Sequence, residues 1–307
     1  MAASTSIEST SQLTGTVPQG WRHTASDYVS LTKPRIVELL LITTVPAMLV
    51  AAGGWPGLGL LAATVVGGAL VSGSAHATNM VLDRDIDGAM RRTAHRPVPS
   101  GRISPPAALA FAAVLLVIGT SLMLFVAGWL PAALTVAAWA WYVGIYTIWL
   151  KRRSVHNIVI GGVAGAAPPM IGWAAVTGSV DPAAVLLFTI VVLWTPTHFW
   201  ALAVGTGTDY ARANVPMLPV VRGPKVAARH GAGYAIATVA ASLALPLTGV
   251  GGFGFVIIAL VLGAVFITQS VRLIGRPDPA AAWKVFHTSN AYLATLFIVV
   301  GIVGLVG

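Results

Sequence analysis

Three oxygen-bearing side chains recur at four-residue intervals in one segment, Asn79, Asp83 and Asp87. On a helix, residues four apart lie on one face, about 5–6 Å apart, whereas Asp85 points away from that stripe. Stacked carboxylates repel each other unless a cation lies among them, and Mg²⁺ prefers oxygen ligands and bridges to substrate phosphates. The spacing therefore predicts a magnesium–phosphate site. A solvated helix end with Asp–Arg pairs on its surface is the alternative interpretation.

Further polar residues fit the chemistry of such a site. Arg92 and Arg96, again four apart, are suited to hold phosphate oxygens, and Asp209 is expected to complete the metal shell from a second loop. His198 lies a few residues inside the end of an apolar segment, where an ionisable side chain is a functional candidate by default. The alternative is a histidine that hydrogen bonds to a neighbouring helix for packing.

The composition restricts which elements can position these residues. Apolar residues make up 56% of the 307 residues and charged residues only 9%, whereas soluble domains carry roughly 25% charged residues. This balance excludes an ordinary soluble domain, a disordered chain and a nucleic-acid binder with a basic surface. With no cysteine in the chain, zinc–thiolate sites and disulfides are excluded as well. We predict an all-α, polytopic membrane bundle.

Nine apolar segments are long enough to form transmembrane helices. They are expected at residues 36–53, 59–80, 105–127, 130–150, 156–177, 183–204, 228–249, 252–272 and 287–306. Residues 1–26 are expected to form a disordered polar tail, and residues 27–307 a single transmembrane domain.

Lysine and arginine follow a strict alternation along the chain. They occur before the first predicted helix and after the second, fourth, sixth and eighth, while the alternate connections contain none. By the positive-inside rule, the N-terminus and the basic loops are cytoplasmic and the C-terminus is outside. The loops after the second and sixth helices are long and hold four of the nine acidic residues, which predicts a functional role for them.

Five segments together resemble the UbiA superfamily of intramembrane prenyltransferases, in its haem-modifying branch. The segments begin at Leu31-Thr32-Lys33-Pro34-Arg35, Asn79, Tyr146-Thr147, Gly161-Gly162 and His198-Phe199-Trp200. The superfamily's second motif often has two aspartates four residues apart, and here Ala213 stands where the second would be. That departure is shared by the haem branch.

The resemblance implies a central cavity capped by the two long loops, in a multi-pass protein of the bacterial plasma membrane. The implied reaction joins farnesyl diphosphate to a vinyl group of haem B, with addition of water, and yields haem O and diphosphate. Haem A synthase or oxidase assembly factors are the implied protein partners, and the lipid bilayer is the surroundings.

The resemblance also implies roles for individual residues. Mg²⁺ would be held by Asn79, Asp83, Asp87 and Asp209, and the diphosphate by Arg92, Arg96, Lys151 and Arg152. Tyr146 would stabilise the allylic cation through its ring face, and His198 and Arg84 would serve haem binding. Two alternatives stay open: a UbiA-type enzyme with an aromatic or quinone-precursor acceptor, and a transporter with an acidic ion site.

Overall fold

The computed structural model describes residues 21–306, apart from the side chains of residues 21–23, 35–36, 38–41 and 207–208. All regular elements in this range are helices, which confirms the all-α class. In chain order they are α1 (Trp21–Leu31), α2 (Pro34–Ala52), α3 (Leu58–Leu82), α4 (Arg84–Ala89), α5 (Pro105–Leu122), η1 (Met123–Ala127), α6 (Trp129–Ala140), η2 (Trp141–Leu150), α7 (Asn157–Thr177), α8 (Pro182–Gly205), α9 (Gly207–Arg212), α10 (Leu218–Arg222), α11 (Pro224–Ala244), η3 (Leu245–Thr248), α12 (Phe253–Gly275) and α13 (Pro279–Val306).

Each predicted transmembrane segment overlaps one long helix. Within the described residues, eight helices are long and apolar enough to cross a membrane. The remaining predicted segment, 36–53, falls in α2, where a shorter apolar stretch covers Ile42–Ala52. The chain is therefore a multi-pass membrane bundle close to the nine-helix expectation.

Two predicted boundaries differ from the structure by five residues or more. Helix α13 begins at Pro279 and not at residue 287, because Pro279 occupies the first turn and Asp278 caps the helix by accepting a hydrogen bond from Ala281 N at 2.8 Å. The prediction begins the span after Lys284, the one charged residue in these first two turns. At the other end, α1 begins at Trp21, inside the predicted tail, and residues 1–20 lie outside the described residues.

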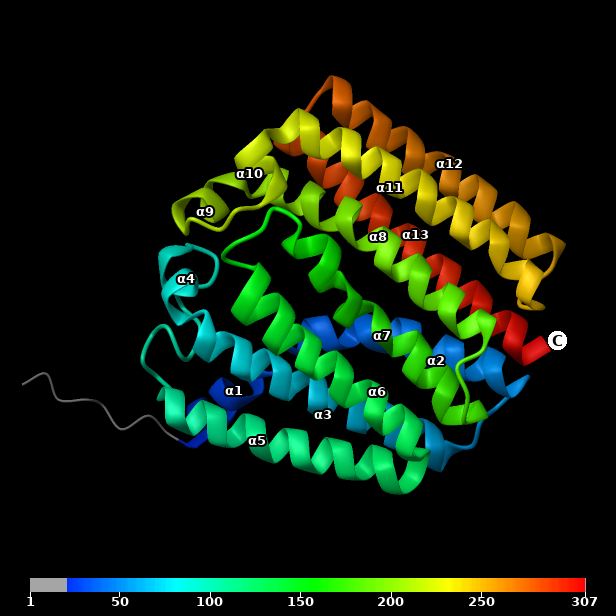
Figure 1. Ribbon diagram of the computed structural model, residues 1–307, viewed down its shortest axis with the longest axis horizontal. Coiled ribbons are helices and arrows are strands. Elements are labelled where there is room, and N and C mark those ends of the chain that lie inside the picture. Colours follow the sequence, from blue (N-terminus) through cyan, green and yellow to red (C-terminus); the bar gives the residue numbers. More distant parts are fainter. Residues whose placement is uncertain (1–20, 307) are drawn as a thin grey trace, which may run out of the picture.

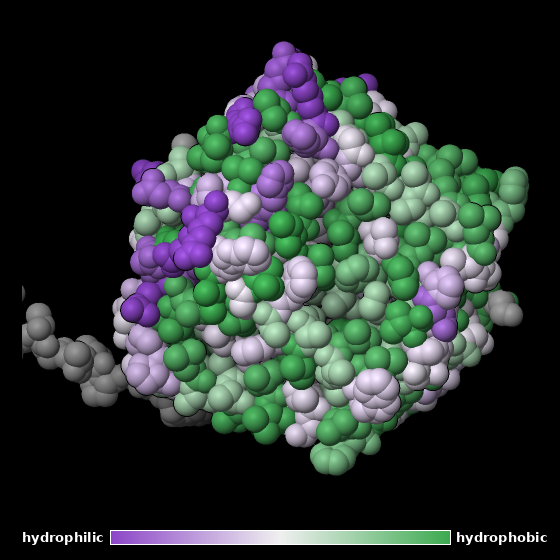
Figure 2. Space-filling view, in the orientation of Figure 1, coloured by the Kyte–Doolittle hydropathy of each residue, from purple (hydrophilic) through white to green (hydrophobic). Residues whose placement is uncertain are grey.

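The short helices gather at one end of the bundle. Figure 1 shows α4, α9 and α10 beside one another there, with the C-terminal end of α13 at the opposite end. On the face drawn in Figure 2, most of the hydrophilic side chains lie at that same end, and the remaining surface is mainly hydrophobic. The two long loops are thus brought together above the ends of the long helices.

Candidate active site

The predicted acidic stripe is built at a break between two helices. Helix α3 ends at Leu82, Asp83 is its C-cap residue, and α4 starts at Arg84. The Asp87 amide still donates to the Asp83 carbonyl at 2.7 Å, so the four-residue register continues across the break. Asn79, Asp83 and Asp87 are all buried. The predicted register is confirmed, and the alternative of a solvated helix end is wrong for these three residues.

Buried carboxylates require positive partners, and each has one. Lys151, just after η2, hydrogen bonds to Asp83 Oδ2, which also accepts from Asn79 Nδ2 at 2.6 Å. Arg96 Nη1 donates to Asp87 Oδ2 at 2.8 Å. Two of the four predicted phosphate-binding cations therefore contact the predicted acids directly.

The other two predicted cations lie farther out. Arg152 forms two 2.7 Å hydrogen bonds with the exposed Asp85, and its Nη2 lies 3.8 Å from Asp83 Oδ1. These hydrogen bonds lower the pKa of Asp85 to about 2. Arg92 is exposed at the surface of the loop after α4. The structure thus forms an inner layer of ions around Asp83 and Asp87 and an outer layer around Asp85.

Lys33 also belongs to the inner layer. It lies between α1 and α2 and donates from Nζ to Asn79 Oδ1 at 2.9 Å. Burial, together with the positive charges of Arg96 and Lys151, lowers the pKa of Lys33 to about 7. In the sequence, Lys33 stood out only as a topology-setting cation and as part of a family motif. Its contact with Asn79 depends on tertiary packing, because the two residues are 46 positions apart.

The donors around Asp83 suit a hard divalent cation. Asp83 Oδ1 is buried without a hydrogen-bond partner among the described residues, and carboxylate and carboxamide oxygens are the ligands that Mg²⁺ prefers. However, within the described side chains no group of three or more His, Cys, Asp and Glu residues is placed to hold a metal ion. Asp209 on α9 contacts Arg212 at 3.5 Å. The predicted fourth ligand is therefore not joined to the stripe, and its role stays a prediction.

The two long loops do meet. Ile86 and Met90 from the first loop and Val215 and Met217 from the second share one apolar cluster with Ile158 and Ala203. Tyr146 and Phe199 also pack against this cluster. The contact between the two loops is therefore apolar.

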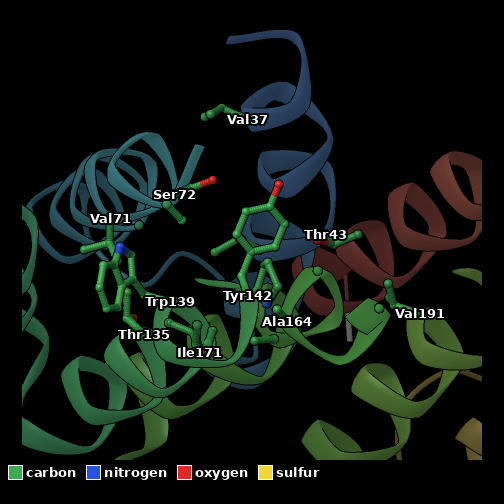
Figure 3. A pocket seen from close by; sticks show the side chains of 18 of the residues that line it. Val37, Thr43, Val71, Ser72, Thr135, Trp139, Tyr142, Ala164, Ile171 and Val191 are labelled. Carbon is green, nitrogen blue, oxygen red and sulfur yellow. The ribbon is translucent and has the colours of Figure 1, made fainter. Parts of the chain in front are cut away.

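A cavity of about 300 Å³ lies among α2, α3, α6, η2, α7 and α8, lined mainly by apolar side chains. Tyr146 and Phe199 belong both to its lining and to the packing beneath the loops, so the loops cover one end of the cavity. Figure 3 shows Tyr142 and Trp139 beside this space, with Thr43 of α2 across from Tyr142. An apolar chamber thus adjoins a buried ionic cluster, in keeping with the capped cavity that the family resemblance implies.

Helix η2 has π-helical geometry. Such geometry is rare in proteins overall, and where it occurs it is often at a functional site. It presents three residues to the site: Tyr142 and Tyr146 on the cavity, and Thr147, whose hydroxyl accepts from Asn79 Nδ2 at 3.1 Å. Gly161 of α7 makes room for this, because a Cβ there would overlap the Tyr146 ring. The glycine pair therefore has a packing reason: a Cβ on Gly162 would likewise come within 2.7 Å of Thr195.

His76 is a cavity residue that the sequence interpretation missed. It lies on α3, three residues before Asn79, and its Nδ1 is buried without a hydrogen-bond partner among the described residues. Its ring meets Tyr142 edge-on, with centroids 5.4 Å apart. An ionisable residue inside an apolar segment was the available signal.

His198 lies away from the cavity lining, between α8 and α13. Its ring is stacked between Trp194 and Phe286, at centroid distances of 4.3 and 4.5 Å. Its Nδ1 is hydrogen bonded to Ser289 Oγ at 2.9 Å. Since Trp194 itself lines the cavity, His198 contacts the cavity wall from behind. Arg84, the other predicted haem residue, is exposed on α4 and donates to the Val81 carbonyl at 3.4 Å.

Residues 40–299 match the UbiA prenyltransferase family. The chain belongs to this family. A relative from Clavibacter michiganensis subsp. michiganensis, named "Protoheme IX farnesyltransferase", is 48% identical over 90% of this chain and 91% of its own. Another with the same name, from Frankia casuarinae, is 48% identical over 92% of this chain and 99% of its own.

Solved UbiA-type structures share the fold. A structure described as digeranylgeranylglyceryl phosphate synthase superposes with a TM-score of 0.73 at 20% identity, covering 92% of this chain and 98% of that one. A UbiA homolog from Archaeoglobus fulgidus bound to GPP and Mg²⁺ gives a TM-score of 0.61 at 15% identity, covering 89% and 99%. Membership of the UbiA prenyltransferase family confirms the resemblance found in the sequence and argues against the transporter alternative.

Proposed function

We propose that this UbiA prenyltransferase transfers the farnesyl group of farnesyl diphosphate to a vinyl group of protohaem IX, with addition of water, giving haem O and diphosphate. The observation that carries the proposal is the buried ionic cluster of Asp83, Asp87, Lys151 and Arg96 at the covered end of an apolar cavity. The choice of haem as acceptor rests on the names of the 48%-identical relatives.

The ionic cluster is suited to the departing diphosphate. Asn79, Asp83, Asp87 and the nearby loop's Asp209 would hold Mg²⁺, and the unpartnered Asp83 Oδ1 is the oxygen that most needs a cation. A bound Mg²⁺ would stabilise the negative charge that develops on the leaving oxygen. Lys151 and Arg96 would bind the remaining phosphate oxygens, and Arg152 and Arg92 would add positive charge at the rim.

The cavity is suited to the fifteen-carbon chain. Its apolar walls would keep water from the allylic cation until the acceptor captures it. Tyr146 lies at the boundary between cavity and cluster, and Lys151 Nζ is 5.9 Å from its ring centroid. The same ring face that attracts Lys151 would stabilise the cation formed as diphosphate leaves.

We assign binding of the haem acceptor to His198 and Arg84, on the chemistry of their side chains. His198 would either position the haem through the wall residue Trp194, on which its ring stacks, or lie near the iron. Arg84 would pair with a haem propionate. We place the enzyme in the bacterial plasma membrane with the basic loops cytoplasmic and the C-terminus outside. Haem A synthase or oxidase assembly factors would receive the product.

The test is expression in cells that lack haem O, followed by chromatography and mass spectrometry of extracted haems. Haem O is expected with the wild-type chain and not with an empty vector. Unmodified haem B alongside a farnesylated quinone precursor would instead support the other acceptor class. Chelation of Mg²⁺ in isolated membranes should abolish turnover, and added Mg²⁺ should restore it; activity that survives chelation contradicts the metal's role.

A further inference from the structure

The turn between α1 and α2 is held firmly against α3. Leu31, the last residue of α1, is fully buried in a cluster with Ala77, Met80 and Val81 of α3 and with residues of α5. Thr32 packs so closely on Gly73 that a Cβ there would come within 3.0 Å of its methyl carbon. The position of the next residue, Lys33, is therefore set by this packing.

Lys33 itself adopts a rare backbone conformation. Its φ of 51° and ψ of 62° are left-handed, and the following residue is Pro34. A non-glycine residue in this region costs on the order of 1–3 kcal/mol, and the residue before proline normally avoids helical conformations. Such strain concentrates at functional sites. Here the unusual turn directs the ammonium group toward Asn79, where it donates the 2.9 Å hydrogen bond.

The partners of the neighbouring cations differ from that of Lys33. Arg96, Lys151 and Arg152 each form an ion pair with a carboxylate. Lys33 donates to a neutral carboxamide, and among the described side chains no carboxylate lies within 4.0 Å of its Nζ. An incoming anion, which favours the protonated form of the amine, would thus find in Lys33 a partly buried donor that need not break an ion pair first.

We propose that Lys33 is a further diphosphate-binding residue, which holds Asn79 Oδ1 before the substrate binds and then moves to a phosphate oxygen. The exchange also releases the carboxamide oxygen of Asn79, which is one of the oxygens suited to the metal. This inference rests on the proposed function, because it assumes a diphosphate in the cluster.

Lys33→Gln is the informative variant, since glutamine can still donate to Asn79 while the positive charge is lost. Lys225→Gln, on an exposed lysine at the start of α11, is the matched control, and Lys33→Arg keeps the charge. The probe is inorganic pyrophosphate with Mg²⁺, titrated calorimetrically into the full chain in detergent.

We expect pyrophosphate affinity to fall about tenfold to a hundredfold in Lys33→Gln, the loss of one hydrogen bond to a charged group. Lys225→Gln should match the wild type, and Lys33→Arg should recover part of the affinity. In turnover assays, KM for farnesyl diphosphate should rise while KM for haem stays unchanged, a split that a purely structural role would not produce. Wild-type affinity in Lys33→Gln overturns the inference.

A measurement on the wild-type chain tests the inference even where a Lys33 variant fails to fold. Acetic anhydride labelling, read by mass spectrometry, should show that pyrophosphate with Mg²⁺ protects Lys33 and leaves Lys225 unprotected. Unchanged labelling of Lys33 in a chain that makes haem O overturns this inference alone. A chain that makes no haem O overturns the proposed function as well.

Discussion

Asn79 and Lys151 bind the same oxygen of Asp83: the Asn79 amide donates to Oδ2 over 2.6 Å, and the Lys151 ammonium hydrogen bonds to it from the end of η2. The second oxygen, Oδ1, is left buried without a hydrogen-bond partner among the described residues. One carboxylate therefore joins α3 to η2 and still offers a negatively charged atom to the site.

Replacement of this carboxylate should stop the reaction while the chain stays folded. In Asp83→Asn, the amide oxygen can still accept from Lys151, but the charged Oδ1 is lost. We expect haem O formation to fall at least about a hundredfold, the scale of losing one electrostatic group in a reaction centre. Asp278→Asn is the control, because asparagine also caps helices well. Turnover of Asp83→Asn comparable to that of the control would contradict the assignment.

Gly161, which lies against the Tyr146 ring, allows a test of whether the position of that ring matters for turnover. A Cβ at Gly161 would overlap the Tyr146 ring, whereas a Cβ at Gly165, also in the cavity lining, would meet nothing within 4 Å. Gly161→Ala should therefore displace the ring and lower kcat about tenfold or more, while Gly165→Ala should resemble the wild type. The two variants are compared in membranes at matched protein levels. Equal activity of both would show that the position of Tyr146 is unimportant.

The Asp85–Arg152 pair makes a prediction about pH. The pKa of Asp85 is lowered to about 2 in the folded chain, from about 3.9 when unfolded. A lowered carboxylate pKa contributes stability above the unfolded value, and this contribution is lost as pH falls through the folded value. The difference in thermal midpoint between wild type and Asp85→Asn should thus be small, because the pair is exposed, and constant from pH 8 to pH 5. A difference that shrinks between pH 8 and pH 5 would contradict the lowered pKa.

The hydrogen bond between His198 and Ser289 can be removed without touching the ring stack. Ser289→Ala leaves the Ser289 carbonyl, which accepts from Trp194 Nε1 at 2.8 Å, but deletes the hydroxyl bonded to His198 Nδ1. We expect a stability loss of about 1 kcal/mol and a raised KM for haem, with KM for farnesyl diphosphate unchanged. Thermal unfolding and steady-state kinetics measure the two effects. Kinetics identical to wild type would remove His198 from the acceptor side.

Much of the site was predictable because the signals are local in the chain. The four-residue register of Asn79, Asp83 and Asp87 follows from helical geometry, and it persists even though α3 ends at Leu82. The apolar segments and the alternation of basic loops follow from the bilayer, which demands about twenty apolar residues per crossing. The first two turns of α13 were missed because the charged Lys284 lies among them, and because Asp278 and Pro279 define where the helix begins.

The sequence by itself determined the membrane class, the family and the residues that carry charge, since periodicity, composition and motifs are properties of single segments. Tertiary structure alone decided which charges meet. Lys151 reaches Asp83 across 68 residues and Lys33 reaches Asn79 across 46, while Asp209 stays with Arg212 on α9. It also placed His76 on the cavity and His198 behind its wall. Such pairings depend on how helices pack at Gly73, Gly161 and Gly162, where the absence of a side chain lets distant segments approach.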